Sequence, residues 1–167
     1  SYDVLPAWHP GHLYLSRYEW RKDATYIDLV SAPYDYLTHH GYFCTMNTYG
    51  ELRSLVGGAT SILNTADERC ISGLVRNLDY SSGFYGFLDG DSAHIKSLVN
   101  LPALTDQAAI DGLKIFLKSS RSEMFIVHVS EGVDAGSLEE FYSLRKQGLL
   151  TDKTAIIHGI PLRSAEF

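Results

Sequence analysis

Hydrophobic positions follow two different patterns along this chain. After residue 51, short apolar runs alternate with amphipathic segments, whereas the first fifty residues show little periodicity. Apolar runs of about four to eight residues are typical of buried strands, and apolar positions three or four residues apart are typical of helices. The pattern therefore predicts alternating strands and helices from residue 51 to the end.

The predicted strands share β-branched or aliphatic composition and turn residues at their ends. They cover residues 59–63, 71–78, 93–101, 124–129 and 154–158. The fourth is almost continuously apolar, as in strands that are buried on both faces of a parallel sheet.

The predicted helices lie between these runs, at residues 51–56, 106–117 and 137–148. The first ends at Gly57-Gly58, which suits a left-handed helix C-terminus. Thr105 or Asp106 can cap the second. Ser137 and Glu140 have the spacing of a capping box at the start of the third.

This alternation favours an α/β fold with parallel strands and right-handed crossovers. A complete eight-stranded barrel needs about 250 residues, and this chain has 167. The chain begins with Ser-Tyr-Asp and ends at Ser164–Phe167, which look like the first turn of another helix. We therefore interpret the chain as an excised portion of a larger domain.

The first fifty residues are rich in aromatic side chains. They contain both tryptophans, eight of the eleven tyrosines and four histidines. We predict a long aromatic loop with one or two short helices, of which residues 18–30 are the best candidate before Ala32-Pro33 interrupts them. Such a loop is a functional lid or binding loop, or simply packs its aromatic side chains against a core.

Charge and cysteine content narrow the class of protein. The net charge is −6 and the 14 basic residues form no tract, which argues against a nucleic-acid partner. No apolar run approaches the roughly 20 residues that span a bilayer, so we expect no membrane partner.

Cys44 and Cys70 have neither disulfide-framework nor zinc-site spacing. We expect two reduced, partly buried thiols and a cytoplasmic protein.

Two of the predicted strands carry a histidine at or next to their carboxyl end, His128 and His158. Active sites of parallel α/β proteins form at the carboxyl ends of strands. Neighbouring strands lie about 4.8 Å apart, so two imidazoles there can share a divalent metal at about 2.0–2.1 Å. Glu131 follows His128 by three residues and is a candidate for general acid–base catalysis.

Each of these residues also has a structural interpretation. A single histidine at the end of a buried strand is more often a hydrogen-bonded core residue than a ligand, but its repetition on successive strands favours a site. Two histidines do not complete a catalytic zinc site, which typically has three protein ligands. Arg76, near the end of the second strand-like run, is a weak candidate for contacting a substrate, and a structural ion pair explains it equally well.

The segment His128-Val129-Ser130-Glu131, a following helix and His158-Gly159 resemble strands five and six of the amidohydrolase superfamily. The similarity is greatest to the branch that contains guanine and cytosine deaminases and triazine chlorohydrolases. Residues 148–159 and 52–62 are also similar, and the resemblance covers most of the chain after residue 51.

The resemblance implies an α/β fold that is part of a (β/α)8 TIM-type barrel and contains its parallel strands two to six. Residues 1–50 would be an aromatic segment of the barrel mouth, and residues 51–167 would be βα units truncated at both ends. His128 and His158 would be metal ligands, for zinc in the first place or iron, and Glu131 would carry protons.

The sequence departs from the family in its ligand set. It has no His-x-His pair of strand one and no strand-eight aspartate. Lys96 lies in a strand-four-like segment, where some relatives carry a carboxylated lysine, but we expect an ordinary solvated lysine.

The function so implied is metal-dependent hydrolysis of C–N or C–halogen bonds in cyclic, amide or amidine substrates by metal-activated water. The substrate would be a small molecule, and the chain alone would lack a complete active site. Open strand edges would lead to a homo-oligomer or to association with missing segments. The alternative is a non-catalytic barrel fragment or an α/β binding domain with structural histidines.

Overall fold

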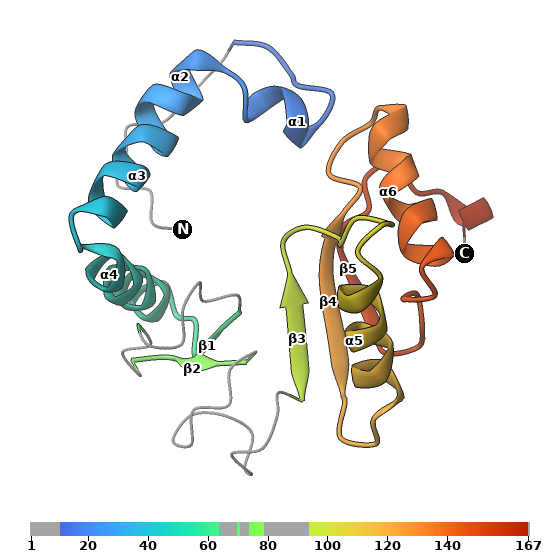
Figure 1. Cartoon of the computed structure of the whole chain (residues 1–167). Helices are drawn as coiled ribbons and strands as arrows, with labels where there is room; N and C mark the ends of the chain where they lie inside the picture. Colours follow the sequence, from blue (N-terminus) through green and yellow to red (C-terminus); the bar gives the residue numbers. More distant parts are fainter. Residues whose placement is uncertain (1–10, 64–69, 71–73, 79–93, 167) are drawn as a thin grey trace. The chain divides into compact units, whose positions relative to one another are not determined.

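The computed structural model describes residues 11–63, 70, 74–78 and 94–166 (Figure 1). The chain divides into two compact units, Ser1–Ser92 and Ala93–Phe167. Each unit is described by itself, and the candidate site lies in the second.

The second unit contains a parallel three-stranded sheet. Its strands are β3 (Ile95–Leu98), β4 (Met124–Val129) and β5 (Thr154–His158), in the order β3-β4-β5. Helix α5 (Gln107–Lys118) connects β3 to β4, and α6 (Ala135–Lys146) connects β4 to β5 (Figure 1). The predicted alternation of parallel strands and helices is confirmed here.

The side chains of β4 alternate between a core face and an open face. Phe125, Val127 and Val129 are fully buried, whereas Ile126 and His128 between them are half-buried. Successive side chains of a strand point to opposite faces, so only one face of β4 belongs to the main core.

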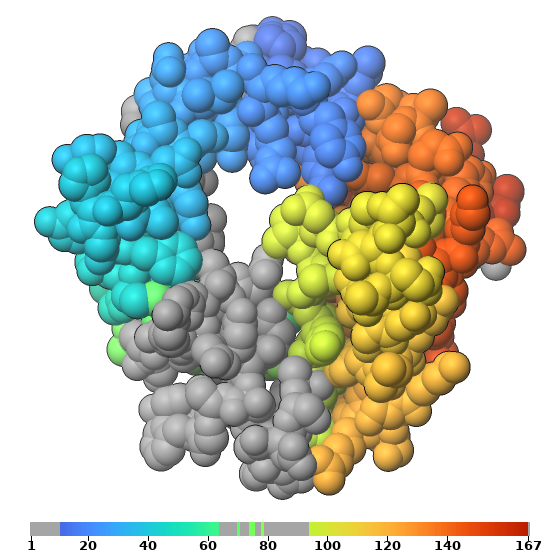
Figure 2. All heavy atoms as spheres, viewed as in Figure 1, coloured from blue at the N-terminus to red at the C-terminus, as the bar shows by residue number. Residues whose placement is uncertain are grey.

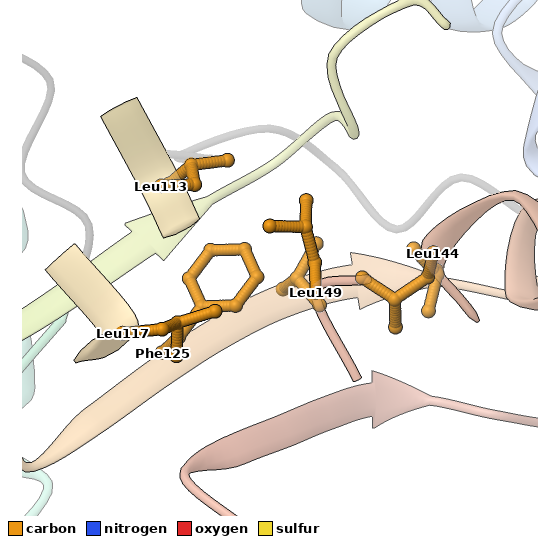
Figure 3. Close-up of a cluster of buried hydrophobic side chains, with 7 residues drawn as sticks. Leu113, Leu117, Phe125, Leu144 and Leu149 are labelled. Atoms are coloured by element: carbon orange, nitrogen blue, oxygen red, sulfur yellow. The ribbon is translucent and has the colours of Figure 1, made fainter. Parts of the chain in front are cut away.

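The core of this unit forms where that face of β4 meets helical residues. Besides the three β4 residues, its buried members are Leu113 and Leu117 of α5, Leu144 of α6 and Leu149 (Figure 3). Full burial of each such side chain stabilises the folded state by about 1.5–3 kcal/mol. Residues 94–166 form a closely packed body (yellow-green to red in Figure 2).

The N-termini of the two helices are capped by aspartates. Asp106 accepts a hydrogen bond from the backbone N–H of Ala109 at 3.1 Å, in agreement with the predicted cap. The predicted capping box of α6 is wrong. The helix begins earlier, and Asp134 accepts from the N–H of Ser137 at 2.8 Å. Because Asp134 already caps this end, the carboxylate of Glu140 is left for another contact.

The predicted aromatic loop is also wrong, because residues 17–56 are largely helical. The helices of the first unit are α1 (Arg17–Trp20), α2 (Ala24–Tyr26), the π-helix η1 (Ile27–Ser31), α3 (Ala32–His39) and α4 (Phe43–Val56).

Pro33 does not break this helical run, because it lies in the first turn of α3, directly after the π-helical turn. There Ala32 donates its N–H to the carbonyl of Ile27, five residues earlier. A proline is tolerated in a first turn, where its missing N–H leaves no helical bond unmade.

The predicted helix end at Gly57-Gly58 is confirmed. α4 ends at Val56, and Gly58, just beyond it, has a φ of +88°. After it, β1 (Ser61–Ile62) pairs in parallel with β2 (Arg76–Asn77). The five predicted strands therefore occur, but they form a two-stranded and a three-stranded sheet. Neither sheet closes on itself within the described ranges, so the structure shows a parallel α/β architecture and not a closed barrel.

The expectation of two reduced thiols is wrong, because Cys44 and Cys70 form a disulfide with a Cα–Cα distance of 4.6 Å. The same helix, α4, also carries Glu51, which is buried and accepts hydrogen bonds from the backbone N–H groups of Leu74 at 3.0 Å and Val75 at 3.4 Å. These contacts join α4 to the segment that leads into β2. A sequence separation of 26 residues gives no indication of that proximity.

Candidate functional site

His128 lies near the carboxyl end of β4, on the face opposite the main core. Its neighbours Val127 and Val129 are fully buried under the helices, so strand alternation turns the imidazole to the other face. It is half-buried there.

His158 reaches the same place through its backbone conformation. The register pairs His158 with Val129 and His128 with Ile157, so a regular strand would direct His158 to the core face. Its φ of +84° departs from strand geometry, and its ring lies against that of His128. A left-handed conformation costs about 1–2 kcal/mol in a residue with a Cβ.

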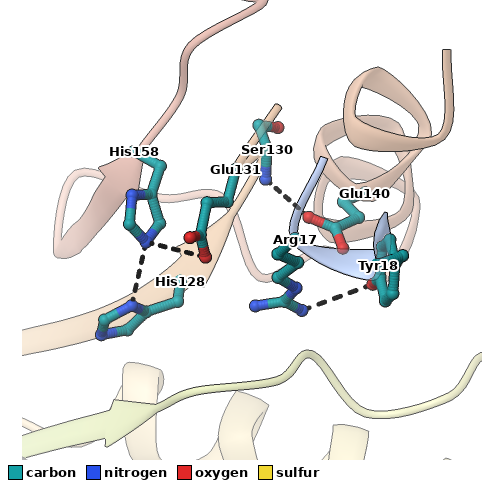
Figure 4. Close-up of polar contacts among 7 residues, drawn as sticks. All are labelled: Arg17, Tyr18, His128, Ser130, Glu131, Glu140 and His158. Atoms are coloured by element: carbon teal, nitrogen blue, oxygen red, sulfur yellow. Dashed lines mark hydrogen bonds and ion pairs between the residues drawn. The ribbon is translucent and has the colours of Figure 1, made fainter. Parts of the chain in front are cut away.

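The two imidazoles and one carboxylate converge (Figure 4). Nδ1 of His128 lies 3.3 Å from Nε2 of His158, and the ring centroids are 5.3 Å apart at an interplanar angle of 61°. The same Nε2 lies 3.3 Å from Oε2 of Glu131, and the side chains of His158 and Glu131 are 28% and 25% exposed. The structure thus brings together the three residues that the sequence predicted for the site.

The turn between His128 and Glu131 is held by Glu140 of α6. Ser130, fully buried, has a φ of +62° and donates its N–H to Oε2 of Glu140 at 2.6 Å (Figure 4). Sequence reasoning missed this contact because it assigned Glu140 to a capping box. Figure 4 also draws Arg17, whose guanidinium donates to the hydroxyl of Tyr18 within the first unit at 3.4 Å.

The spacing of the two imidazole nitrogens suits a shared cation. Ligand nitrogens at about 2.0–2.1 Å from a tetrahedral zinc are roughly 3.3 Å apart, which matches the observed 3.3 Å. The same contact is a hydrogen bond between the two rings when either nitrogen carries a proton, so a shared cation would take the place of that proton. Within the described ranges, no group of three or more His, Cys, Asp or Glu side chains is arranged to hold a metal. The fit is therefore that of two ligands.

Two other residues considered from the sequence do not join this cluster. The Lys96 ammonium lies 5.3 Å from the centre of the Phe116 ring, on the helix-covered side of the sheet. The backbone of Arg76 lies in β2 of the other unit, and its side chain is outside what the structure describes. Its predicted substrate contact stays a prediction.

Comparison of the chain with family models, with curated proteins and with solved structures found no match. Among the helices of the described residues, none is both long and apolar enough to cross a membrane.

Proposed function

We propose that this chain is part of a metal-dependent hydrolase of the amidohydrolase type, in which His128 and His158 bind one divalent cation, zinc in the first place. The observation that carries the proposal is the 3.3 Å separation of His128 Nδ1 and His158 Nε2 at the carboxyl ends of adjacent parallel strands. The resemblance of residues 128–131 and 158–159 to that superfamily supports it. So does the parallel βαβ arrangement, which suits a segment of a larger barrel.

The proposed reaction is hydrolysis of a C–N or C–halogen bond in a small cyclic, amide or amidine substrate. The cation, when bound, would supply Lewis acidity and lower the pKa of a water molecule. Glu131 would hold the proton at Oε2, beside His158, and deliver it to the leaving group. His128 and His158 bind as neutral imidazoles, so binding would require that the two ring nitrogens facing each other be unprotonated.

The test is zinc binding to the full chain and to two variants, His128→Ala and His158→Ala. We expect calorimetric zinc binding in the native chain and at least about a tenfold weaker affinity in each variant, since even changes around a metal site cost about 10–100-fold. His94→Ala is the matched control. His94 belongs to the same unit but lies just before β3, at the opposite end, where its Nδ1 is 3.6 Å from Glu123.

The lack of a third ligand among the described side chains favours a second candidate, a non-catalytic α/β module with structural histidines. On that hypothesis the native chain binds no zinc. His128→Ala and His158→Ala would then lower only the free energy of unfolding. The same calorimetry and a denaturant titration therefore separate the two functions.

A further inference from the structure

Ser130 occupies a backbone conformation that a residue with a side chain seldom adopts. Its φ is +62° and it is fully buried. Its hydroxyl oxygen has no hydrogen-bond partner among the described residues. Since the side chain gains no hydrogen bond there, the conformation must be held by the backbone contacts of Ser130.

Those backbone contacts connect three elements at one point. The N–H of Ser130 donates to Oε2 of Glu140 on α6 at 2.6 Å. Its carbonyl accepts from the N–H of Ile160 at 3.0 Å, and the carbonyl of Val129 accepts from the N–H of Gly159 at 3.2 Å. The segment directly after His158 is therefore bonded to the same turn that leads from His128 to Glu131.

The hydrogen bond that Ser130 donates to Glu140 is the shortest of these three, at 2.6 Å. A carboxylate that accepts from a backbone N–H forms a charge-assisted hydrogen bond, which is stronger than a bond between neutral groups. Glu140 is half-buried, which limits competition from water. Because α6 packs on the core through Phe141 and Leu144, its carboxylate is a fixed anchor for the turn.

We propose that Glu140 is a positioning residue of the candidate site: through Ser130 it sets the left-handed turn that directs Glu131 and the segment after His158 toward His128. The expected effect of Glu140 on zinc affinity rests on the proposed function. Its effect on the arrangement of the two imidazoles and the Glu131 carboxylate does not, and that arrangement is measurable without metal.

Four variants of the full chain test this proposal. Glu140→Ala removes the acceptor, whereas Glu140→Gln keeps an oxygen that can accept the same hydrogen bond. Glu139→Ala is the matched control, because it removes an exposed carboxylate from the neighbouring position of α6. Ser130→Ala keeps the N–H and removes only the hydroxyl.

The first measurement is NMR without metal, on the Ser130 amide proton and on the nuclear Overhauser contacts between the His128 and His158 rings. Glu140→Ala should shift the amide proton upfield and lose the contacts between the rings, while the other three variants retain both. The second measurement is zinc affinity, expected to fall about 10–100-fold in Glu140→Ala and to stay near native in Glu140→Gln.

Unchanged ring contacts in Glu140→Ala, or an equal loss in Glu139→Ala, would overturn the proposal. If Glu140→Ala fails to fold, Glu140→Asp decides, because it keeps the charge but withdraws the oxygens by one carbon–carbon bond. It should show the same losses to a smaller degree, and native behaviour would contradict the role of Glu140. If the native chain binds no zinc, the proposed function fails while the ring contacts still test Glu140.

Discussion

Backbone conformation at Ser130 and His158 determines where the polar groups of the candidate site lie. Both residues have positive φ angles, +62° and +84°; Ser130 directly follows β4, and His158 is the last residue of β5. Non-glycine residues persist in that region only where surrounding contacts hold them, and such residues cluster at functional sites. A sequence pattern identifies neither angle, because non-glycine residues adopt positive φ too rarely for a single serine or histidine to indicate it.

In the first unit, the hydrogen-bonded pair of Tyr14 and Asp23 makes stability depend on pH. Tyr14 donates its hydroxyl to Oδ2 of Asp23 at 2.7 Å. Burial, together with that hydrogen bond and the negative charge of Asp23, raises the pKa of Tyr14 from 10.0 to about 12. The hydrogen bond from Tyr14 is the main reason that the pKa of Asp23 falls below its ordinary 3.8.

We expect Tyr14 to add to the free energy of unfolding below about pH 10, because the folded state holds its phenolic proton more tightly than the unfolded state does. This contribution is lost as the pH rises toward 12. The contribution from Asp23 has the opposite sign. It is present above pH 3.8 and is lost as the pH falls through the lowered pKa. Ultraviolet titration of the phenolates should lose a component near pH 12 in Tyr14→Phe but not in Tyr42→Phe. Identical curves for Tyr14→Phe and the native chain would contradict the assignment.

At the scale of elements, the second unit follows its sequence pattern closely and the first does not. β4, α5 and β5 carry aliphatic residues at strand or helix spacing, so their burial could be predicted. The helices before residue 57 carry tyrosines, which suit both buried and exposed positions and therefore blur the periodicity. The π-helical turn before Pro33 has no sequence signal of its own. That His128 and His158 lie at the ends of adjacent strands was predictable from strand order, whereas the turn of His158 toward His128 and the contact of Glu140 were not.

The cap of α6 gives a prediction at this scale. Asp134→Ala should lower the free energy of unfolding by about 1 kcal/mol, because the N–H of Ser137 loses its acceptor. Asp134→Asn keeps a side-chain oxygen and should remain near native. Chemical denaturation of both variants measures the difference. Equal stability of Asp134→Ala and the native chain would show that another group caps the helix.

At the scale of the whole molecule, the two units differ in what stabilises them. Among its described residues, the second unit has an apolar core cluster of seven buried residues, and it contains no cysteine. The first unit has the Cys44–Cys70 disulfide and the buried Glu51 carboxylate as long-range connections. Disulfides persist mainly in oxidising compartments, so the disulfide removes the thiol argument for a cytoplasmic protein.

Reduction of the Cys44–Cys70 disulfide should therefore destabilise the first unit more than the second. Opening a loop with a sequence separation of 26 residues is expected to destabilise the first unit by about 3.5 kcal/mol. Hydrogen exchange with and without a reductant should show faster exchange in α4 and unchanged protection in α5, β4 and α6. The variant Cys44→Ser with Cys70→Ser should reproduce the reduced state. Equal acceleration in both units would mean that they unfold together.

The step from β4 through α6 to β5 has a kinetic consequence. His128, Glu131, Glu140 and His158 all belong to this one βαβ stretch, and the two histidines are 30 residues apart in the chain. The pairing of β4 with β5 is therefore non-local, and parallel pairings of this kind form slowly because loop-closure entropy is lost before their contacts are gained. The cluster should therefore assemble only when this whole βαβ stretch has folded, because β4 or β5 alone supplies a single imidazole.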